Sequence, residues 1–94
     1  MGSKLTEDQI TQKLSQHALW RREGGEIVRD LKFKDFAAAL AFVNLVGAQA
    51  EEIDHHPDIL LHGWNNVRLS VMTHSEGALT DKDFELARRV DEIA

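Results

Sequence analysis

Three histidines stand near the boundaries of predicted elements and are the residues whose type and spacing best fit chemistry in this 94-residue chain. His55, His56 and Pro57 are consecutive, and His74 ends an alternating segment further along. Histidine both gives and takes protons near neutral pH, because its unperturbed pKa is about 6.5. The pattern therefore predicts a small site for proton transfer.

The same histidines fit other interpretations. His55 and His56 fit a polar loop between a helix and a strand, and His74 fits a strand end that faces solvent. Three imidazoles can hold zinc, but sequence neighbours rarely point to one centre, and the chain has no His-Glu-x-x-His motif. We therefore expect no metal. A serine nucleophile is not expected either, since Ser70 and Ser75 lie outside any nucleophile-elbow sequence.

Three other polar or aromatic residues near the histidines also have structural interpretations. Trp64 is of a type that most often lies in a core or covers a sheet. Glu51 fits the solvated last turn of a helix. Asp83 fits a capping box with Thr80, three residues before it. These interpretations stay open beside a role in chemistry.

A capping box and a glycine pair predict the first elements that must position these residues. Thr6 and Gln9 have the spacing of a capping box, which begins a short amphipathic helix with Ile10 and Leu14 on its apolar face. Gly24-Gly25 between two extended segments predicts a hairpin, because the tight turns of hairpins need positive φ.

The second arm of this hairpin, Ile27 to Phe33, predicts a strand with one apolar face. Ile27, Leu31 and Phe33 lie on that face, and Val28, Asp30 and Lys32 lie on the other. Arg29 interrupts the apolar face, which makes the register of this strand harder to predict from the sequence.

A long helix is predicted from Asp35, which can cap it, to about Glu52. Its apolar residues recur at three- and four-residue intervals, which predicts a buried stripe. That predicted stripe contains Phe36, Leu40, Val43, Gly47 and Ala50. Small alanines on the flanks permit close packing and favour a helix.

The second half of the chain repeats the strand and helix signals. Pro57 must end the long helix, 59–61 is a short apolar strand, and 67–73 alternates clearly. Thr80 opens a last helix whose apolar side contains Leu86, Val90 and Ile93. The order is α-β-β-α-β-β-α. It predicts a two-layer α+β domain, a four-stranded antiparallel sheet with helices packed on one face.

Composition narrows the class of protein. The length fits one domain over residues 1–94, with residues 1–4 expected to be a disordered leader or cloning remnant. The apolar fraction of 43% favours a folded globule. No cysteine is present, which excludes disulfides and thiolate chemistry, and a net charge of −5 disfavours nucleic-acid binding. No membrane span or secretory leader is predicted, so we expect a cytoplasmic protein.

The combined spacing of seven residues resembles the signature of the pterin-4a-carbinolamine dehydratase family. Two flanking segments extend the resemblance to about Leu5–Ile93: Phe33-Lys34-Asp35-Phe36 at the start of the long helix, and Thr73-His74-Ser75 with the residues after it. The chain departs from many members at Ala78, where they have glycine, and by one extra residue before Trp64. The seven signature residues are Glu51, His55, His56, Pro57, Trp64, His74 and Asp83.

The resemblance implies an activity and a set of site residues. The activity is the loss of water from 4a-hydroxytetrahydropterin (4a-hydroxytetrahydrobiopterin), giving the quinonoid dihydropterin in tetrahydropterin recycling. His55, His56 and His74 would be catalytic, with support from Glu51 and Asp83. No cofactor or metal is implied, since the pterin is the substrate. The pterin would be held by His55, His56, Pro57, Trp64, Thr73, His74, Ser75 and Glu76.

The resemblance also implies protein partners. Family members form dimers or tetramers, so a homo-oligomer is expected. Some members act as dimerisation cofactors of transcription factors, and divergent relatives assist enzyme assembly, so a non-enzymatic interaction module is the alternative function. The histidine pair is retained here, which favours the enzyme. Which histidine is the acid and which is the base does not follow from the sequence.

Overall fold

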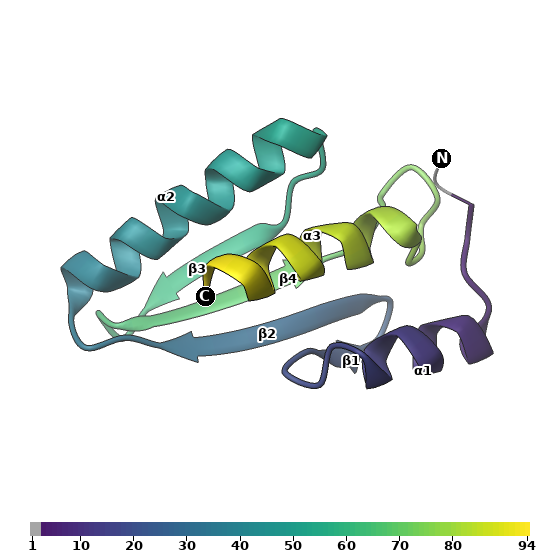
Figure 1. Ribbon diagram of the computed structural model, residues 1–94, viewed down its shortest axis with the longest axis horizontal. Coiled ribbons are helices and arrows are strands. Elements are labelled where there is room, and N and C mark those ends of the chain that lie inside the picture. Colours follow the sequence, from purple (N-terminus) through teal and green to yellow (C-terminus); the bar gives the residue numbers. More distant parts are fainter. Residues whose placement is uncertain (1–2) are drawn as a thin grey trace.

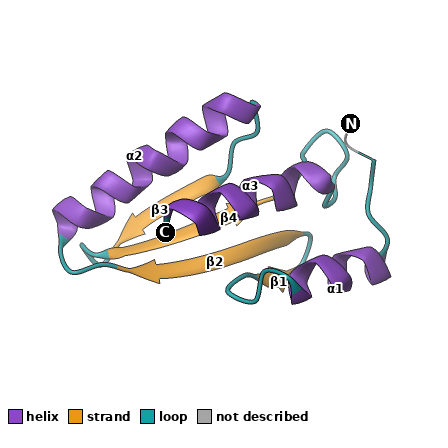
Figure 2. Cartoon of the chain, viewed as in Figure 1, coloured by secondary structure: helices purple, strands orange, loops and turns teal. Residues whose placement is uncertain are grey.

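A computed structural model describes residues 3–94 as three helices and one four-stranded sheet, in the predicted order (Figures 1 and 2). The expectation for Met1 and Gly2 lies outside the described residues. The chain joins the fold from Leu5, whose backbone N–H donates to the carbonyl of Leu79 at 3.0 Å. The elements are α1 (Glu7–Ser15), β1 (Arg21–Glu23), β2 (Glu26–Lys32), α2 (Phe36–Ile53), β3 (Asp58–His62), β4 (Asn66–Val71) and α3 (Asp81–Ile93).

The sheet is antiparallel throughout, with strand order β1-β2-β4-β3, and this confirms the α+β fold. The central strand β4 buries every second residue, because one face of the sheet is covered by helices. Figure 1 shows α2 and α3 lying along the sheet and α1 near β1. The core between the layers includes Ile27, Val46, Leu69, Leu86 and Val90.

The three predicted helix starts are confirmed. Thr6 and Gln9 exchange the two hydrogen bonds of a capping box, and Thr80 and Asp83 do the same at α3. Asp35 accepts from the backbone N–H of Ala38 at 2.8 Å. These caps satisfy backbone donors that helix ends leave unpaired. They fix the residues at which α2 and α3 begin, and therefore where the preceding loops end.

The predicted buried stripe of α2 is wrong at its start, at Phe36 and Leu40, whereas Ala50 is buried as predicted and Val43 packs against the core. Phe36 and Leu40 are 49% and 42% exposed, whereas the buried residues are Ala39, Phe42, Val46 and Ala50. The prediction followed the larger side chains of a helix that is apolar on nearly every side. Ala39, which the prediction left out, is fully buried, and its small side chain lets the backbone approach its neighbours closely. The remaining apolar face of α2 is left uncovered by the other described residues, 3–94.

By length and composition, α2 is the one helix of residues 3–94 that could cross a membrane. Core helices of globular proteins pass the same test. In this structure α2 contacts α3, β3 and β4 through its buried stripe. One face of α2 thus packs against the sheet and α3, and 22% of the helix is buried.

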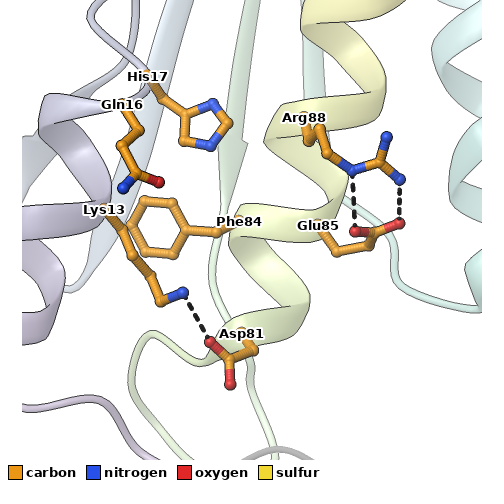
Figure 3. Close-up of a pocket in the computed structure, with 7 residues that line it drawn as sticks. All are labelled: Lys13, Gln16, His17, Asp81, Phe84, Glu85 and Arg88. Carbon is orange, nitrogen blue, oxygen red and sulfur yellow. Dashed lines mark hydrogen bonds and ion pairs between the residues drawn. The ribbon is translucent and has the colours of Figure 1, made fainter.

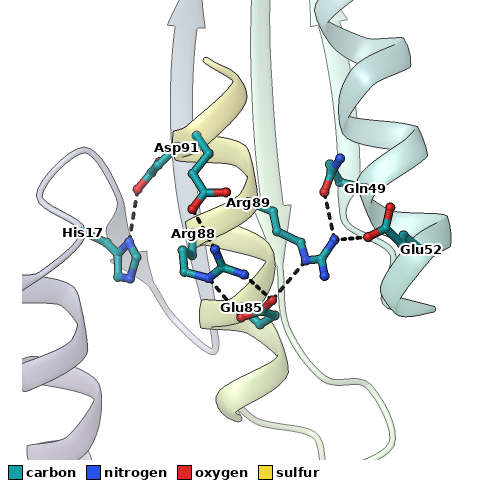
Figure 4. A network of polar contacts seen from close by, with 8 residues as sticks. His17, Gln49, Glu52, Glu85, Arg88, Arg89 and Asp91 are labelled. Carbon is teal, nitrogen blue, oxygen red and sulfur yellow. Dashed lines mark hydrogen bonds and ion pairs between the residues drawn. The ribbon is translucent and has the colours of Figure 1, made fainter.

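Arg29 lies on the helix-facing side of β2, as the predicted register requires, and it is 9% exposed. Its Nη1 donates to Oδ1 of Asp91 in α3 at 2.6 Å. The same carboxylate accepts from Trp20 Nε1 at 2.8 Å. It also lies 3.1 Å from His17 Nδ1, the contact that Figure 4 shows. The charge of Arg29 on the apolar face is therefore balanced by Asp91. Asp91 also joins α3 to β2 and to the segment after α1.

Replacing Asp91 by alanine is expected to lower the free energy of unfolding by about 1.5–3 kcal/mol, because Arg29 and Trp20 would lose a charged partner. Urea unfolding followed by tryptophan fluorescence measures this. Glu92→Ala is the control: Glu92 is exposed and pairs with Arg88 on the surface, so a loss below about 1 kcal/mol is expected. Equal losses in the two variants would contradict a structural role for Asp91.

A second polar network holds the end of α2 against α3 (Figure 4). Arg89 of α3 donates to Gln49 at 3.0 Å and to Glu52 at 2.8 Å, both in the last turns of α2. Hydrogen bonds from Arg88 and Arg89 lower the pKa of Glu85 to about 2, so Glu85 stays ionised as their anionic partner at neutral pH. The network places the residues that follow α2 beside the start of α3.

Candidate active site

The turn after α2 and the end of β4 meet at one end of the sheet. Asp54 ends α2 in the left-handed conformation, with φ 51°, and the chain passes through His55 and His56 into β3. The antiparallel pairing of Asp58 with Ser70 places the residues before β3 beside those after β4. His74 follows β4, so the fold brings His74 to the same end of the sheet as His55 and His56.

All three predicted histidines line one open cavity of ≈ 260 Å³. Its size is close to the lower end of small-molecule sites, which enclose roughly 300–1,000 Å³. The structure therefore brings together the residues on which the proton-transfer hypothesis depends. The lining residues are Asp54, His55, His56, Met72, Thr73, His74, Ser75 and Lys82.

His55 is buried and bonded to a carboxylate. Its Nε2 lies 2.6 Å from Oδ1 of Asp83, which is fully buried in the first turn of α3. Oδ2 of Asp83 accepts from the backbone N–H of Thr80 and from the hydroxyl of Thr73, each at 2.9 Å. Asp83 is thus both the predicted cap and a partner of the site histidine, so the two interpretations hold together.

His56 and His74 are the exposed histidines of the cavity. His56 Nε2 pairs with the carboxylate of Glu51, one turn back in α2, on the surface. The ring of His74 has no hydrogen-bond partner among residues 3–94. Of the three imidazoles, that of His74 is therefore the most available to a ligand.

A tight turn holds His74 and Ser75 at the cavity. A single β-bridge joins Thr73 to Ala78, and the N–H of Gly77 donates to the carbonyl of His74 at 3.1 Å. Gly77 carries the positive φ of this turn, at 61°, and Ala78 does not. Alanine at 78 therefore needs no strained backbone, and the departure from the family pattern leaves the turn intact.

Three of the predicted binding residues do not line the cavity. Pro57 and Glu76 lie next to lining residues, whereas Trp64 lies in the β3–β4 turn at the opposite end of the sheet (Figure 1). The five residues of β3 at ~3.3 Å each place Trp64 about 16 Å from the histidine end. Trp64 is 60% exposed. Within residues 3–94 it does not line the histidine cavity, and its role in binding the pterin stays a prediction.

Sequence reasoning missed Asp54, Met72 and Lys82 as lining residues. Each is the sequence neighbour of a predicted site residue, and this adjacency could have identified it as a lining residue. Lys82 is the second residue of α3 and the one lysine or arginine among the lining residues. It brings a positive charge to the cavity.

A second cavity of the same volume lies between α1 and α3 (Figure 3). Its charged side chains are paired with one another: Lys13 lies 3.1 Å from Asp81, and Arg88 lies 2.6 Å from Glu85. Its single histidine, His17, is the one that approaches Asp91. This cavity lacks a set of available imidazoles, so we take the histidine cavity as the candidate active site.

Comparisons with known proteins identify the family of this chain. Residues 3–93 match the family described as "Pterin 4 alpha carbinolamine dehydratase". Relatives provisionally named pterin-4-alpha-carbinolamine dehydratase occur in Chloroflexus aurantiacus (47% identity, 96% of each chain) and Acidobacterium capsulatum (43%, 97% of this chain and 98% of the relative).

Two solved structures are similar. One is a transcriptional coactivator/pterin dehydratase from Brucella melitensis, with TM-score 0.92, 34% identity, and coverage of 98% of this chain and 99% of that one. The other is a pterin dehydratase-like protein identified as a RuBisCO assembly factor in the alpha-carboxysome, with TM-score 0.65, 24% identity, and coverage of 80% and 86%. At that identity the second likeness concerns the fold alone. The match along nearly the whole chain and the relatives above 40% identity show that this protein belongs to the pterin-4a-carbinolamine dehydratase family.

Proposed function

We propose that this protein removes water from 4a-hydroxytetrahydropterin, giving the quinonoid dihydropterin, with histidines as the acid and base. The observation that supports the proposal most is the sharing of one cavity by His55, His56 and His74. These residues come from two segments that lie far apart in the sequence. Family membership supports the substrate class.

The reaction needs two proton movements. One proton goes to the departing 4a-hydroxyl as the C4a–O bond breaks, and one leaves N5 as the N5=C4a double bond forms. No electrons leave the substrate, so we propose no redox cofactor. Imidazoles suit both steps, and a positioned acid or base contributes about 10²–10⁴-fold to the rate.

The test is to generate 4a-hydroxytetrahydropterin in solution and to follow its dehydration by absorbance, with and without the protein. We expect the protein to raise the rate above the spontaneous rate in proportion to its concentration. An unchanged rate at micromolar protein would contradict the enzymatic proposal.

Extensive chelation is expected to leave this activity unchanged, because the proposed chemistry depends on imidazoles. In residues 3–94 no group of three or more His, Asp or Glu side chains is arranged to hold a metal ion. The measurement compares dehydration rates before and after dialysis against EDTA. A loss that added zinc restores would require a metal in the mechanism.

We propose that the chain acts as a homo-oligomer. The uncovered face of α2 has small residues along its middle and larger apolar ones at its flanks, a shape that lets two helices approach closely. It carries no charge before Glu51. Strand β3 is also an edge of the sheet and leaves its outer backbone groups available for pairing. The exposed α2 residues include Phe36, Ala37, Leu40, Ala41, Asn44, Leu45 and Ala48.

Replacing Leu40 by glutamate is expected to lower the oligomeric state, because it would place a charge in the proposed α2 contact. Size-exclusion chromatography with light scattering measures the mass. Thr11→Glu, which adds the same charge to an exposed position of α1, is expected to leave the mass unchanged. A wild type that is monomeric at tens of micromolar would contradict the oligomer.

An interaction role is the second candidate, and the exposed apolar face of α2 favours it. The similar Brucella protein is named both a coactivator and a dehydratase. A binding role would use this face and would not need the histidines. Retention of a partner by a His74→Ala variant that no longer dehydrates pterin would show two separable functions. We propose the cytoplasm as the place of both.

A further inference from the structure

The hydroxyl of Thr73 donates a hydrogen bond to the buried carboxylate of Asp83. Thr73 lies outside the strands and helices, so this bond is not part of the sheet or of a helix cap. Asp83 is fully buried and receives three hydrogen bonds. The bond from the Thr80 N–H belongs to the cap of α3, and the bond with His55 belongs to the cavity. The third, from Thr73 Oγ1, crosses from the segment after β4, and Thr73 itself is 4% exposed.

The hydrogens of this cluster can be placed by elimination. Thr73 has one hydroxyl hydrogen and donates it to Oδ2 of Asp83. Thr80 Oγ1 lies 2.7 Å from Thr73 Oγ1, so Thr80 must be the donor of that bond. The hydroxyls therefore run in one direction, from Thr80 through Thr73 to the carboxylate. Bonds in such a chain polarise and strengthen one another.

This arrangement limits what His55 can do. Oδ2 of Asp83 already accepts two hydrogen bonds, and an ionised carboxylate can only accept at Oδ1. The Nε2 of His55 must then carry the hydrogen. Buried side-chain nitrogens of residues 3–94 all have partners. The other ring nitrogen of His55, Nδ1, has no protein partner in this part of the chain, so it lies where solvent or a ligand reaches it.

We propose that Thr73 is a positioning residue: it holds Asp83 so that His55 keeps the Nε2–H tautomer, with the Nδ1 lone pair as the proton acceptor of the cavity. The proposal rests on the proposed function. Neutral His55 in this tautomer takes the proton from N5. The proton for the departing hydroxyl then comes from another cavity histidine, and exchange with solvent restores both rings.

The test reads the His55 tautomer directly. Long-range ¹⁵N–¹H correlation spectra of the protein without substrate distinguish Nε2–H from Nδ1–H, and the His55 signals are those lost in His55→Gln. We expect Nε2–H alone in the wild type and in Thr73→Ser, which keeps the hydroxyl. Thr73→Val, of nearly the same shape, is expected to show both tautomers and a kcat lowered about 10–100-fold, as when partners that orient an active histidine are removed, with KM little changed.

Two results would overturn the proposal. One is an Nδ1–H tautomer in the wild type, which needs no variant to fold. The other is a Thr73→Val protein that keeps both the Nε2–H tautomer and the wild-type kcat. Because the tautomer is read without pterin, its outcome is independent of whether the protein accelerates dehydration, and failure of the proposed function is recognised separately.

Discussion

Replacing His74 by alanine is expected to lower kcat for dehydration by about 10²–10⁴-fold, the usual contribution of a positioned acid or base. His74 should show the largest effect because its ring is exposed at the cavity and has no hydrogen-bond partner among residues 3–94. His55→Ala and His56→Ala are expected to reduce the rate less. The measurement is the dehydration assay with each variant at matched concentration.

His62→Ala is the matched control for these variants. His62 is an exposed histidine at the far end of β3, beside the turn that contains Trp64. Its removal changes the histidine content equally but leaves the cavity intact, so an unchanged kcat is expected. Equal losses in His62→Ala and His74→Ala would show that the effect does not come from the cavity.

Replacing Asp83 by alanine is expected to lower the free energy of unfolding by about 3–5 kcal/mol, as for other buried ionic partners. The substitution would leave His55, the Thr73 hydroxyl and the Thr80 N–H without their acceptor in a fully buried position. Urea unfolding followed by circular dichroism gives the value. Because such a loss is a large share of the stability of a small domain, poor expression of this variant at 37 °C is also expected.

Asp81→Ala is the control for Asp83→Ala. Asp81 lies in the same first turn of α3, but its side chain is 68% exposed, and its partner is Lys13 on the surface. A loss below about 1 kcal/mol is expected. If Asp83→Ala were as stable as Asp81→Ala, the buried carboxylate would not hold this end of the molecule together.

The elements with local signals could be predicted from the sequence. The capping boxes at Thr6 and Thr80, the glycine turn at 24–25 and the stop at Pro57 each act within a few residues. They therefore fix the element order without knowledge of the packing. The grouping of the three histidines could be predicted through the family resemblance. The structure supplies its physical cause, which is the antiparallel pairing of β3 with β4.

The features that the sequence could not supply depend on contacts between distant residues. The orientation of α2 follows from how Ala39, Phe42 and Val46 pack, and a helix apolar on nearly all sides does not reveal it. Arg29 looked like an interruption because its partner, Asp91, lies 62 residues away. Trp64 shares the signature spacing, but a hairpin carries it to the opposite end of the sheet.

The location of a bound pterin tests the central claim most directly. Amide chemical shifts of the ¹⁵N-labelled protein are measured during titration with 7,8-dihydropterin, which lacks the 4a-hydroxyl and does not react. The largest changes are expected at 54–56, 72–75 and Lys82, around the three histidines. Largest changes around Lys13, His17 and Phe84, or none at millimolar ligand, would contradict the assignment of the histidine cavity as the active site.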